Sequence, residues 1–313
     1  MERSFYFKTI ILFLGFAFNI WGQPIEPKEN KKPIKSLFFK RELNLRHGLL
    51  KLKYAFNKSA KKSRSIDIIK KEWQLTFHDN FDSLDTKKWR LGQPWGEFHP
   101  GYKHQYYSKD LVKVKDGKLF LLGVNQPRTF IEQDIEVSIP YGVGLVNTDI
   151  SFQQKYGYFE IKSINPKGPA TWPAFWLTGA NRWPPEIDIF EMYGRKTGQT
   201  IHNQYVTVHW GKTDTKSRGF LSQKINLPNN SDSVFHTYGC LWTPYFISFY
   251  TDGHLVSKIR VNKRLRKWIN DEMVIIINNS FDHRYTQYLP KDFKQNEFII
   301  DYISVYSLPE NEI

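Results

Sequence analysis

Cysteine is almost absent from the sequence, which has Cys240 alone among 313 residues. A single thiol cannot form an internal disulfide, so the chain does not belong to the disulfide-stapled class of small domains. Histidine and cysteine also do not cluster at the spacings of a zinc site. The fold therefore has to be stabilised by a core, and 40% apolar residues are enough for one large core.

Long hydrophobic runs are also scarce, and the most prominent one is Thr9 to Trp21 near the N-terminus. It follows the basic residues Arg3 and Lys8 and ends at Gly22. The run is short for a membrane span, so residues 1–22 are predicted to be a cleaved signal peptide. An uncleaved anchor is the alternative. With a single cysteine, this leader predicts a secreted, extracellular or periplasmic, bacterial protein.

Acidic residues are too few to balance the basic ones, and the net charge is +14. Residues 1–72 hold 17 Lys+Arg against 6 Asp+Glu, or +11, which leaves 28 against 25, or +3, for residues 73–313. Residues 23–72 are therefore predicted to be a basic linker or pro-segment, which could also touch an anionic envelope surface through a short amphipathic helix. The chain carries no recognised nucleic-acid module, so nucleic acid is not an expected partner.

A sustained helical period is missing from Trp73 onward, as is any long repeat. Short alternating runs separated by turn residues predict an all-β fold, a jelly-roll sandwich of two antiparallel sheets over residues 73–308 with a tail at 309–313. Asp116-Gly117 and Asp252-Gly253 predict hairpin turns, because such turns need positive φ. Predicted strands are 118–122, 144–152, 156–163, 205–210, 245–250, 255–261, 273–278 and 297–306.

Three carboxylates interrupt one apolar run, Glu186 to Glu191. Strict alternation places Glu186 and Asp188 on one face but buries Glu191 among isoleucines, where a lone charge is very costly. One inserted residue, a β-bulge marked by Phe190, would return Glu191 to the face of the other two. The two glutamates would then be about four strand steps apart, roughly 13 Å between Cα atoms at ~3.3 Å per step.

Two glutamates on one face suit a retaining glycosidase, whose carboxyl groups lie ~5 to 5.5 Å apart when the side chains lean together. A metal site is the rival interpretation of the three acids. Catalysis is favoured, because tryptophans lie near the acids and no cluster of histidines and cysteines does. Indole rings suit the apolar faces of sugars. The candidate substrate-binding residues are Trp172, Trp176, Trp183, His209 and Arg182.

The motifs around the carboxylates resemble those of glycoside hydrolase family 16. WPAFW at 172–176 precedes EIDIFE at 186–191, and further matching segments extend over about residues 73–308. These segments are WQLTFHDNFD with Trp89, YGYFEI at 156–161, FHTYGCLWTP at 235–244, FYTDG at 249–253 and IIDYISVY at 299–306.

The resemblance implies two curved antiparallel sheets with a concave cleft and retaining endo-hydrolysis of β-1,3- or β-1,4-linked polysaccharides. It implies Glu186 as nucleophile, Asp188 as the assisting carboxylate and Glu191 as general acid/base, with no cofactor for catalysis. Some members hold a structural calcium, for which Asp301 matches a ligand position, while Asn80 stands where many members have an acidic residue.

The substrate is left open between a glucan and a galactan. Pro184-Pro185 and Phe190 differ from the usual laminarin-cleaving pattern, and Arg182, Arg195 and Lys196 could contact sulfate groups or be solvated loop charges. Two other functions are alternatives, a transglycosylase that remodels cell-wall glycan and a catalytically silent carbohydrate-binding module. The protein is expected to act on its polysaccharide as a monomer.

Overall fold

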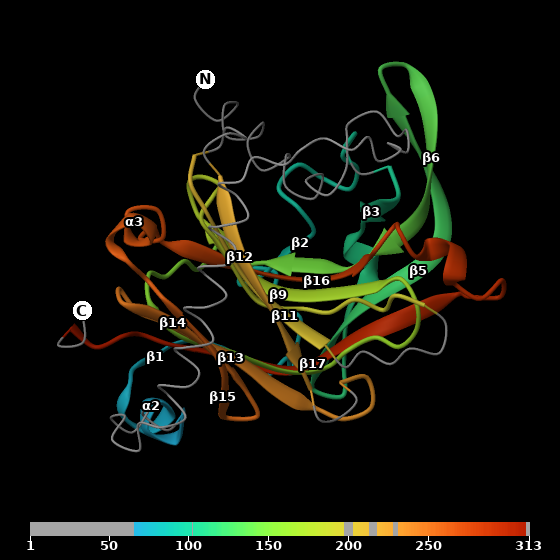
Figure 1. The fold of residues 1–313 in the computed structure, drawn as a ribbon. Coiled ribbons are helices and arrows are strands. Elements are labelled where there is room, and N and C mark those ends of the chain that lie inside the picture. The colour runs from blue at the N-terminus through green and yellow to red at the C-terminus, as the bar shows by residue number, and fades with distance from the viewer. Residues whose placement is uncertain (1–65, 102, 197–202, 213–217, 228–230, 311–313) are drawn as a thin grey trace.

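A computed structural model describes residues 66–101, 103–196, 203–212, 218–227 and 231–310 (Figure 1). The predicted signal peptide and residues 23–65 of the basic segment lie outside these ranges, and both remain predictions. Within the described ranges, none of the helices has the length and apolar character needed to cross a bilayer.

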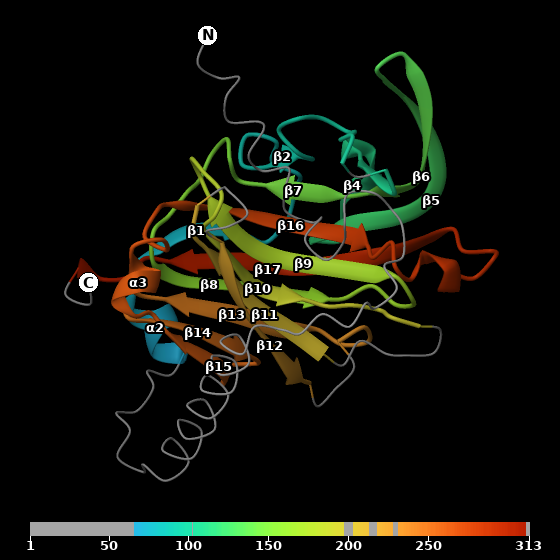
Figure 2. The ribbon, with the colours of Figure 1, turned by 45° about the horizontal axis from the view of Figure 1, so that its top comes forward.

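Two β-sheets dominate the structure and lie one over the other (Figures 1 and 2). The larger sheet has ten strands, and its main path runs in the order β15 (His254–Arg260), β14 (Phe246–Thr251), β13 (His236–Trp242), β8 (Gly157–Ile164), β17 (Gln295–Tyr306), β5 (Lys118–Glu132), β6 (Ile135–Val143) and β3 (Gln105–Tyr107). Its other two strands are β1 (Leu75–Asp79), which pairs with β17, and β4 (Val112–Lys115), which pairs with β5.

The smaller sheet has seven strands in the order β12 (Gly219–Asn226), β11 (Asn203–Trp210), β10 (Glu186–Glu191), β9 (Thr171–Gly179), β16 (Met273–Phe281), β7 (Leu145–Asn147) and β2 (Arg90–Leu91). The short helical elements are α2 (Ile66–Glu72), α3 (Lys263–Arg266) and the 3₁₀ turns η3 (Lys109–Leu111) and η4 (Thr286–Tyr288). The pairing is antiparallel except between β3 and β6. The predicted all-β jelly-roll sandwich is confirmed.

The main core lies between the two sheets because both present apolar side chains to it. From the smaller sheet come Phe175, Ile187 and Phe190, which are completely buried. The larger sheet faces them with residues such as Tyr238 and Phe298, whose rings lie 4.6 and 5.9 Å from that of Phe190. The smaller sheet therefore has one face in the core, and its other face is left for the polar residues.

The two predicted hairpin turns are present. Asp252 and Gly253 join β14 to β15 with φ of 49° and 74°, and Asp116 and Gly117 join β4 to β5 with φ of 51° and 64°. The strand predicted over residues 144–152 is too long, since β7 ends at Asn147. The Asn147 side chain accepts the backbone N–H of Asp149 at 2.6 Å and so starts a turn there.

The hairpin formed by β5 and β6 is much longer than the predicted strand at 118–122. It projects beyond the body of the sandwich in Figure 1 and turns at Gln133 and Asp134, both with positive φ. The preceding loop supports it, because Phe98 stacks on Phe130 at 5.0 Å and Glu97 pairs with Arg128 at 2.8 Å. These long-range contacts were not visible in the alternation of its sequence.

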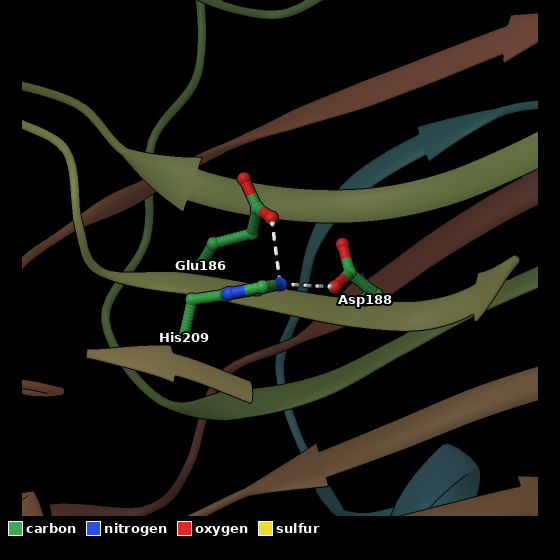
Figure 3. Close-up of side chains that lie close together, drawn as sticks. All are labelled: Glu186, Asp188 and His209. Carbon is green, nitrogen blue, oxygen red and sulfur yellow. Dashed lines mark ion pairs between the residues drawn. The ribbon is translucent and has the colours of Figure 1, made fainter. Parts of the chain in front are cut away.

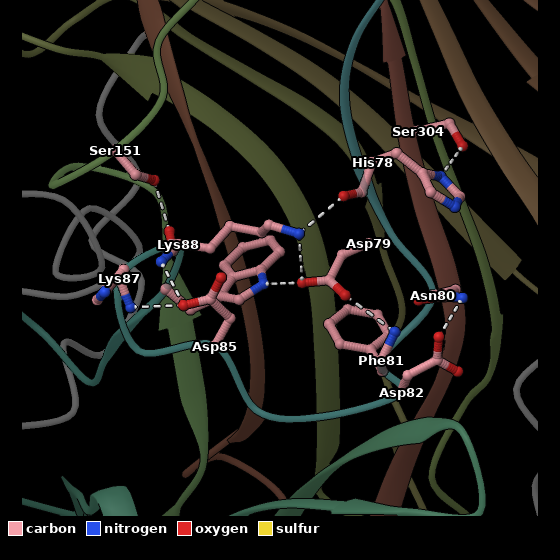
Figure 4. A network of polar contacts seen from close by, with 11 residues as sticks. His78, Asp79, Asn80, Phe81, Asp82, Asp85, Lys87, Lys88, Ser151 and Ser304 are labelled. Atoms are coloured by element: carbon pink, nitrogen blue, oxygen red, sulfur yellow. Dashed lines mark hydrogen bonds and ion pairs between the residues drawn. The ribbon is translucent and has the colours of Figure 1, made fainter.

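The segment WQLTFHDNFD, together with Trp89, forms a buried polar network around Asp79 (Figure 4). One carboxylate oxygen of Asp79 accepts the Trp89 indole N–H at 2.7 Å, and the other accepts the Phe81 backbone N–H at 2.9 Å. Lys88 adds an ion pair at 3.4 Å. Asp79, at the end of β1, thereby fixes the loop that follows, which explains why the motif combines these residue types.

Helix α2 precedes the predicted boundary at Trp73 and packs against the larger sheet, so this part of the predicted linker segment contacts the sandwich. Ile66 and Ile69 are buried, and Lys70 pairs with Glu160 of β8 at 2.5 Å. Glu160 is 1% exposed and also accepts the hydroxyls of Tyr158 and Tyr302, each at 2.7 Å. The ammonium of Lys70 thus supplies the countercharge of a buried carboxylate.

Replacing Lys70 by Met should lower the free energy of unfolding by about 1 to 3 kcal/mol, because Glu160 would lose its countercharge while buried. Urea denaturation followed by tryptophan fluorescence measures this loss. Lys71→Met, at an exposed position of the same helix, is the matched control and should change little. Equal effects of the two substitutions would show that the Lys70–Glu160 pair does not stabilise the domain.

Candidate active site

A β-bulge interrupts β10 between Asp188 and Phe190. Toward β9, Asp188 pairs with Trp176 and Phe190 with Phe175, so two steps along β10 match one step along β9. Ile189 and Phe190 together oppose one residue, as in a β-bulge, and both side chains enter the core. The predicted bulge and the place of Phe190 in it are confirmed.

The bulge brings all three carboxylates of β10 to one face of the smaller sheet. Glu186 lies opposite His209 of β11, and Glu191 lies opposite Tyr205, four residues earlier on the same strand. Residues directly opposite one another in an antiparallel pair share a face, and so do residues four apart on a regular strand. We call this side of the sheet, with Glu186, Asp188 and Glu191, the carboxylate face.

His209 connects two of the three carboxylates (Figure 3). Its Nε2 lies 3.4 Å from an oxygen of Glu186 and 3.4 Å from an oxygen of Asp188. Glu186 and Asp188 are 6% and 4% exposed, so their charge has little access to water. His209, predicted as a substrate-binding residue, thus contacts the carboxylates Glu186 and Asp188.

Glu191 has a separate set of partners. Its Oε1 accepts the indole N–H of Trp172 at 3.0 Å and the hydroxyl of Tyr193 at 2.8 Å. Both donors use the same oxygen, which leaves Oε2 as the natural place for a proton. Tyr193 is itself held by ring contacts to Trp172 and Tyr205, with centroids at 5.5 and 5.2 Å.

Burial raises the pKa of both glutamates above the usual carboxyl range. For Glu191 burial and then the charge of Asp188 raise the pKa to about 7, against the hydrogen bond from Tyr193, the charge of His209 and the hydrogen bond from Trp172. For Glu186 burial, Asp188 and Glu191 raise the pKa, and the Trp183 indole opposes them. The cluster therefore retains a proton near neutral pH, as an acid catalyst requires.

Comparison with known proteins gives these residues a context. The model of "Glycosyl hydrolases family 16" matches residues 103–292, more than half of the chain. The chain belongs to glycosyl hydrolase family 16. This confirms the resemblance found in the sequence.

The family 16 chain is similar to two curated proteins of Rhizobium meliloti (strain 1021). It is 34% identical over 255 residues to endo-1,3-1,4-beta-glycanase ExsH and 27% identical over 253 residues to endo-1,3-1,4-beta-glycanase EglC. Each alignment covers 74% of this chain and 51% of the relative, so the chain spans about half the length of these proteins.

A solved structure shares the fold. The catalytic domain of an endo-1,3-beta-glucanase (laminarinase) from Thermotoga petrophila RKU-1 aligns with a TM-score of 0.61 and 26% identity, over 75% of this chain and 98% of that one. The two-sheet sandwich of the family 16 chain is thus the fold of a laminarinase domain.

The tryptophans of the family 16 motif lie partly as predicted. Trp172 and Trp176 are half-buried on the carboxylate face, and Phe175 between them is in the core. Trp176 donates its indole N–H to Asn278 at 2.8 Å. Trp183, also a predicted substrate-binding residue, is only 3% exposed, and the Arg218 guanidinium lies 4.9 Å from its ring. The indole N–H of this buried tryptophan opposes the rise in the pKa of Glu186.

The arginines near the site are engaged within the protein. Arg182 pairs with Asp271 at 2.5 Å and donates to the backbone carbonyls of Pro184 and Trp268 at 3.0 and 3.3 Å. Arg195 donates to the hydroxyl of Tyr205 at 2.8 Å. Arg182 therefore joins two loops, and this arrangement favours a structural role over sulfate binding.

A metal ion is the rival interpretation of the carboxylates. Two places could hold one, namely the cluster around Glu186 and the position of Asp301. Oxygens of Glu186 and Asp188 and a nitrogen of His209 lie within 4.8 Å of one another, close enough to share an ion. A metal site would leave Glu191 and its two donors without a role, so the catalytic interpretation is favoured. Asp301, the predicted calcium ligand, lies 2.7 Å from Lys162 Nζ, so a lysine supplies positive charge at this carboxylate.

Tyr193 is a site residue that the sequence interpretation missed. It lies beyond the end of β10, and its spacing of two from Glu191 was the available signal. Asn278 was also missed, since only the pairing of β16 with β9 brings it beside Trp176.

Replacing Tyr193 by Phe should raise the pKa of Glu191 further, because the hydroxyl stabilises the ionised carboxylate. The rise should be roughly one pH unit, the effect of one hydrogen bond to a charged group. Carbon-13 NMR titration of labelled glutamate side chains, assigned with Glu191→Gln, measures it. Tyr205→Phe is the control that leaves the Tyr193 hydroxyl in place, and an unchanged or lowered pKa in Tyr193→Phe would contradict the assigned contact.

Proposed function

We propose that this chain is a secreted, retaining, endo-acting glycoside hydrolase of β-1,3- or β-1,4-linked polysaccharides. The observation that carries the proposal is the placement of Glu186 and Glu191 on one face, with separate hydrogen-bond partners for each. Membership of family 16 and the similarity to proteins named endo-1,3-1,4-beta-glycanase support the same class of substrate.

In the first step Glu186, as the anion, attacks the anomeric carbon of the bound sugar. The bond to the departing sugar breaks as Glu191 Oε2 donates its proton to the glycosidic oxygen. The Trp183 indole favours the ionised form of Glu186 against burial, Asp188 and Glu191, which raise its pKa, and burial raises the pKa of Glu191 to about 7. The product is a glycosyl ester on Glu186.

In the second step Glu191, now the anion, removes a proton from water as the water attacks the anomeric carbon. The ester bond breaks, Glu186 leaves as a carboxylate and Glu191 regains its proton. Asp188, next to both glutamates on the carboxylate face, repels additional negative charge and so favours the protonated form of Glu191 between turnovers. This cycle needs no cofactor.

Transglycosylation is the second candidate, because a sugar hydroxyl can replace water in the second step with the same residues. Burial of Glu186 and Asp188 favours this candidate, because it limits the access of water to the glycosyl ester. A silent binding module is less favoured, because such a module has no need for three clustered acids, among which Glu186 and Glu191 have raised pKa values. Export through residues 1–22 and a monomeric state are retained as parts of the proposal.

The proposal is tested by digesting laminarin, lichenan, agarose, porphyran and carrageenan and sizing the products. At least one polymer should be shortened to oligosaccharides of intermediate length, since an endo-acting enzyme cuts internal bonds. Products longer than the starting oligosaccharides, formed when acceptors are added, would instead favour transglycosylation.

Glu186→Gln is the control in the same assay, checked by circular dichroism for an intact fold. It should lower activity by at least about 10⁴-fold, since loss of a nucleophile removes the covalent step. If no polymer is shortened by the wild type, or if the variant keeps full activity, the proposed function is wrong.

A further inference from the structure

Phe220 is a large apolar side chain on the carboxylate face that the mechanism above does not use. It lies on β12, the edge strand of the smaller sheet, and is 68% exposed. Its directly opposite residue on β11 is His209. An exposed aromatic ring beside a reacting centre calls for an explanation, since water makes a poor partner for it.

Phe220 continues a row of residues that contains the proposed nucleophile. Thr178, Glu186, His209 and Phe220 lie opposite one another on the neighbouring strands β9, β10, β11 and β12. Two strand spacings separate Glu186 from Phe220, roughly 10 Å at ~4.8 Å per spacing. A glycan that crosses the strands over Glu186 would therefore reach Phe220 with a neighbouring sugar unit.

Contacts connect the Phe220 ring to the carboxylates through His209. The two rings lie 5.8 Å apart with an interplanar angle of 31°, and His209 Nε2 is 3.4 Å from both Glu186 and Asp188. The next residues of β12 on the same face are polar, namely Ser222, Lys224 and Asn226. This stretch of β12 thus combines one apolar ring with polar groups, as recognition of a sugar requires.

We propose that Phe220 is the stacking platform of a subsite for a pyranose unit that neighbours the reacting one, on the β12 side. The inference rests on the proposed function and adds a binding residue to it. The apolar C–H face of the sugar packs on the ring, and the sugar hydroxyls remain available to water and the polar residues of β12.

A second copy of the chain is the competing occupant of this surface, because an edge strand offers unpaired backbone groups. The exposed Lys224 on the same strand opposes such pairing, since charged edge residues discourage strand addition. The oligomeric state is therefore one of the measured outcomes.

The test uses Glu186→Gln, which should bind without cleaving, and oligosaccharides of increasing length made from the polymer that the wild type shortens. Isothermal titration calorimetry should show that Phe220→Ala weakens binding of long oligosaccharides about tenfold and leaves the shortest ones unchanged. Phe220→Trp should retain the affinity, because it keeps an aromatic face. Phe220→Ala is expected to fold normally, since the ring is mostly exposed.

Two results would overturn the proposal. One is an affinity for long oligosaccharides that is the same with and without Phe220→Ala in the Glu186→Gln protein, and the other is a change in sedimentation behaviour without a change in affinity, which would assign the ring to self-association. Failure of the proposed function is separate from both, because it would already appear as an absence of polymer shortening by the wild type.

Discussion

The site depends on the single inserted residue in β10. Without the bulge at Ile189 and Phe190, Glu191 would point into the apolar layer between the sheets, where an ionised carboxylate is very costly. With it, Phe190 fills the core against Tyr238 and Phe298 while Glu191 joins Glu186 and Asp188 outside. One local irregularity thus satisfies the packing of the core and the geometry of the acids together.

The three neighbouring carboxylates repel one another, and different side chains contact different carboxylates. His209 contacts Glu186 and Asp188, while Trp172 and Tyr193 donate to one oxygen of Glu191. Because the strands on both sides of β10 supply His209 and Trp172, each partner is fixed by the register of the sheet. The pKa of Glu191 is raised by burial and by Asp188 of the same strand, and Tyr193, His209 and Trp172 oppose this rise.

The sequence was sufficient for features whose cause is local. The odd spacing of Glu191 predicted the bulge, and Asp252-Gly253 predicted its hairpin. Features that depend on distant segments were missed or wrong. Trp183 contacts Arg218, Lys70 pairs with Glu160 and Asp301 pairs with Lys162, and each partner is far away in the sequence. Phe220 needed the pairing of β12 with β11 before it could be related to Glu186.

The most direct test of the account is to trap the covalent intermediate with a slow 2-deoxy-2-fluoro glycoside that has a good leaving group, and to locate the label by peptide mass spectrometry. One glycosyl group is expected on Glu186, and it should be released when water or an acceptor sugar is supplied. A label on Glu191 or Asp188, or turnover of the reagent with inversion and without any labelled peptide, would contradict it.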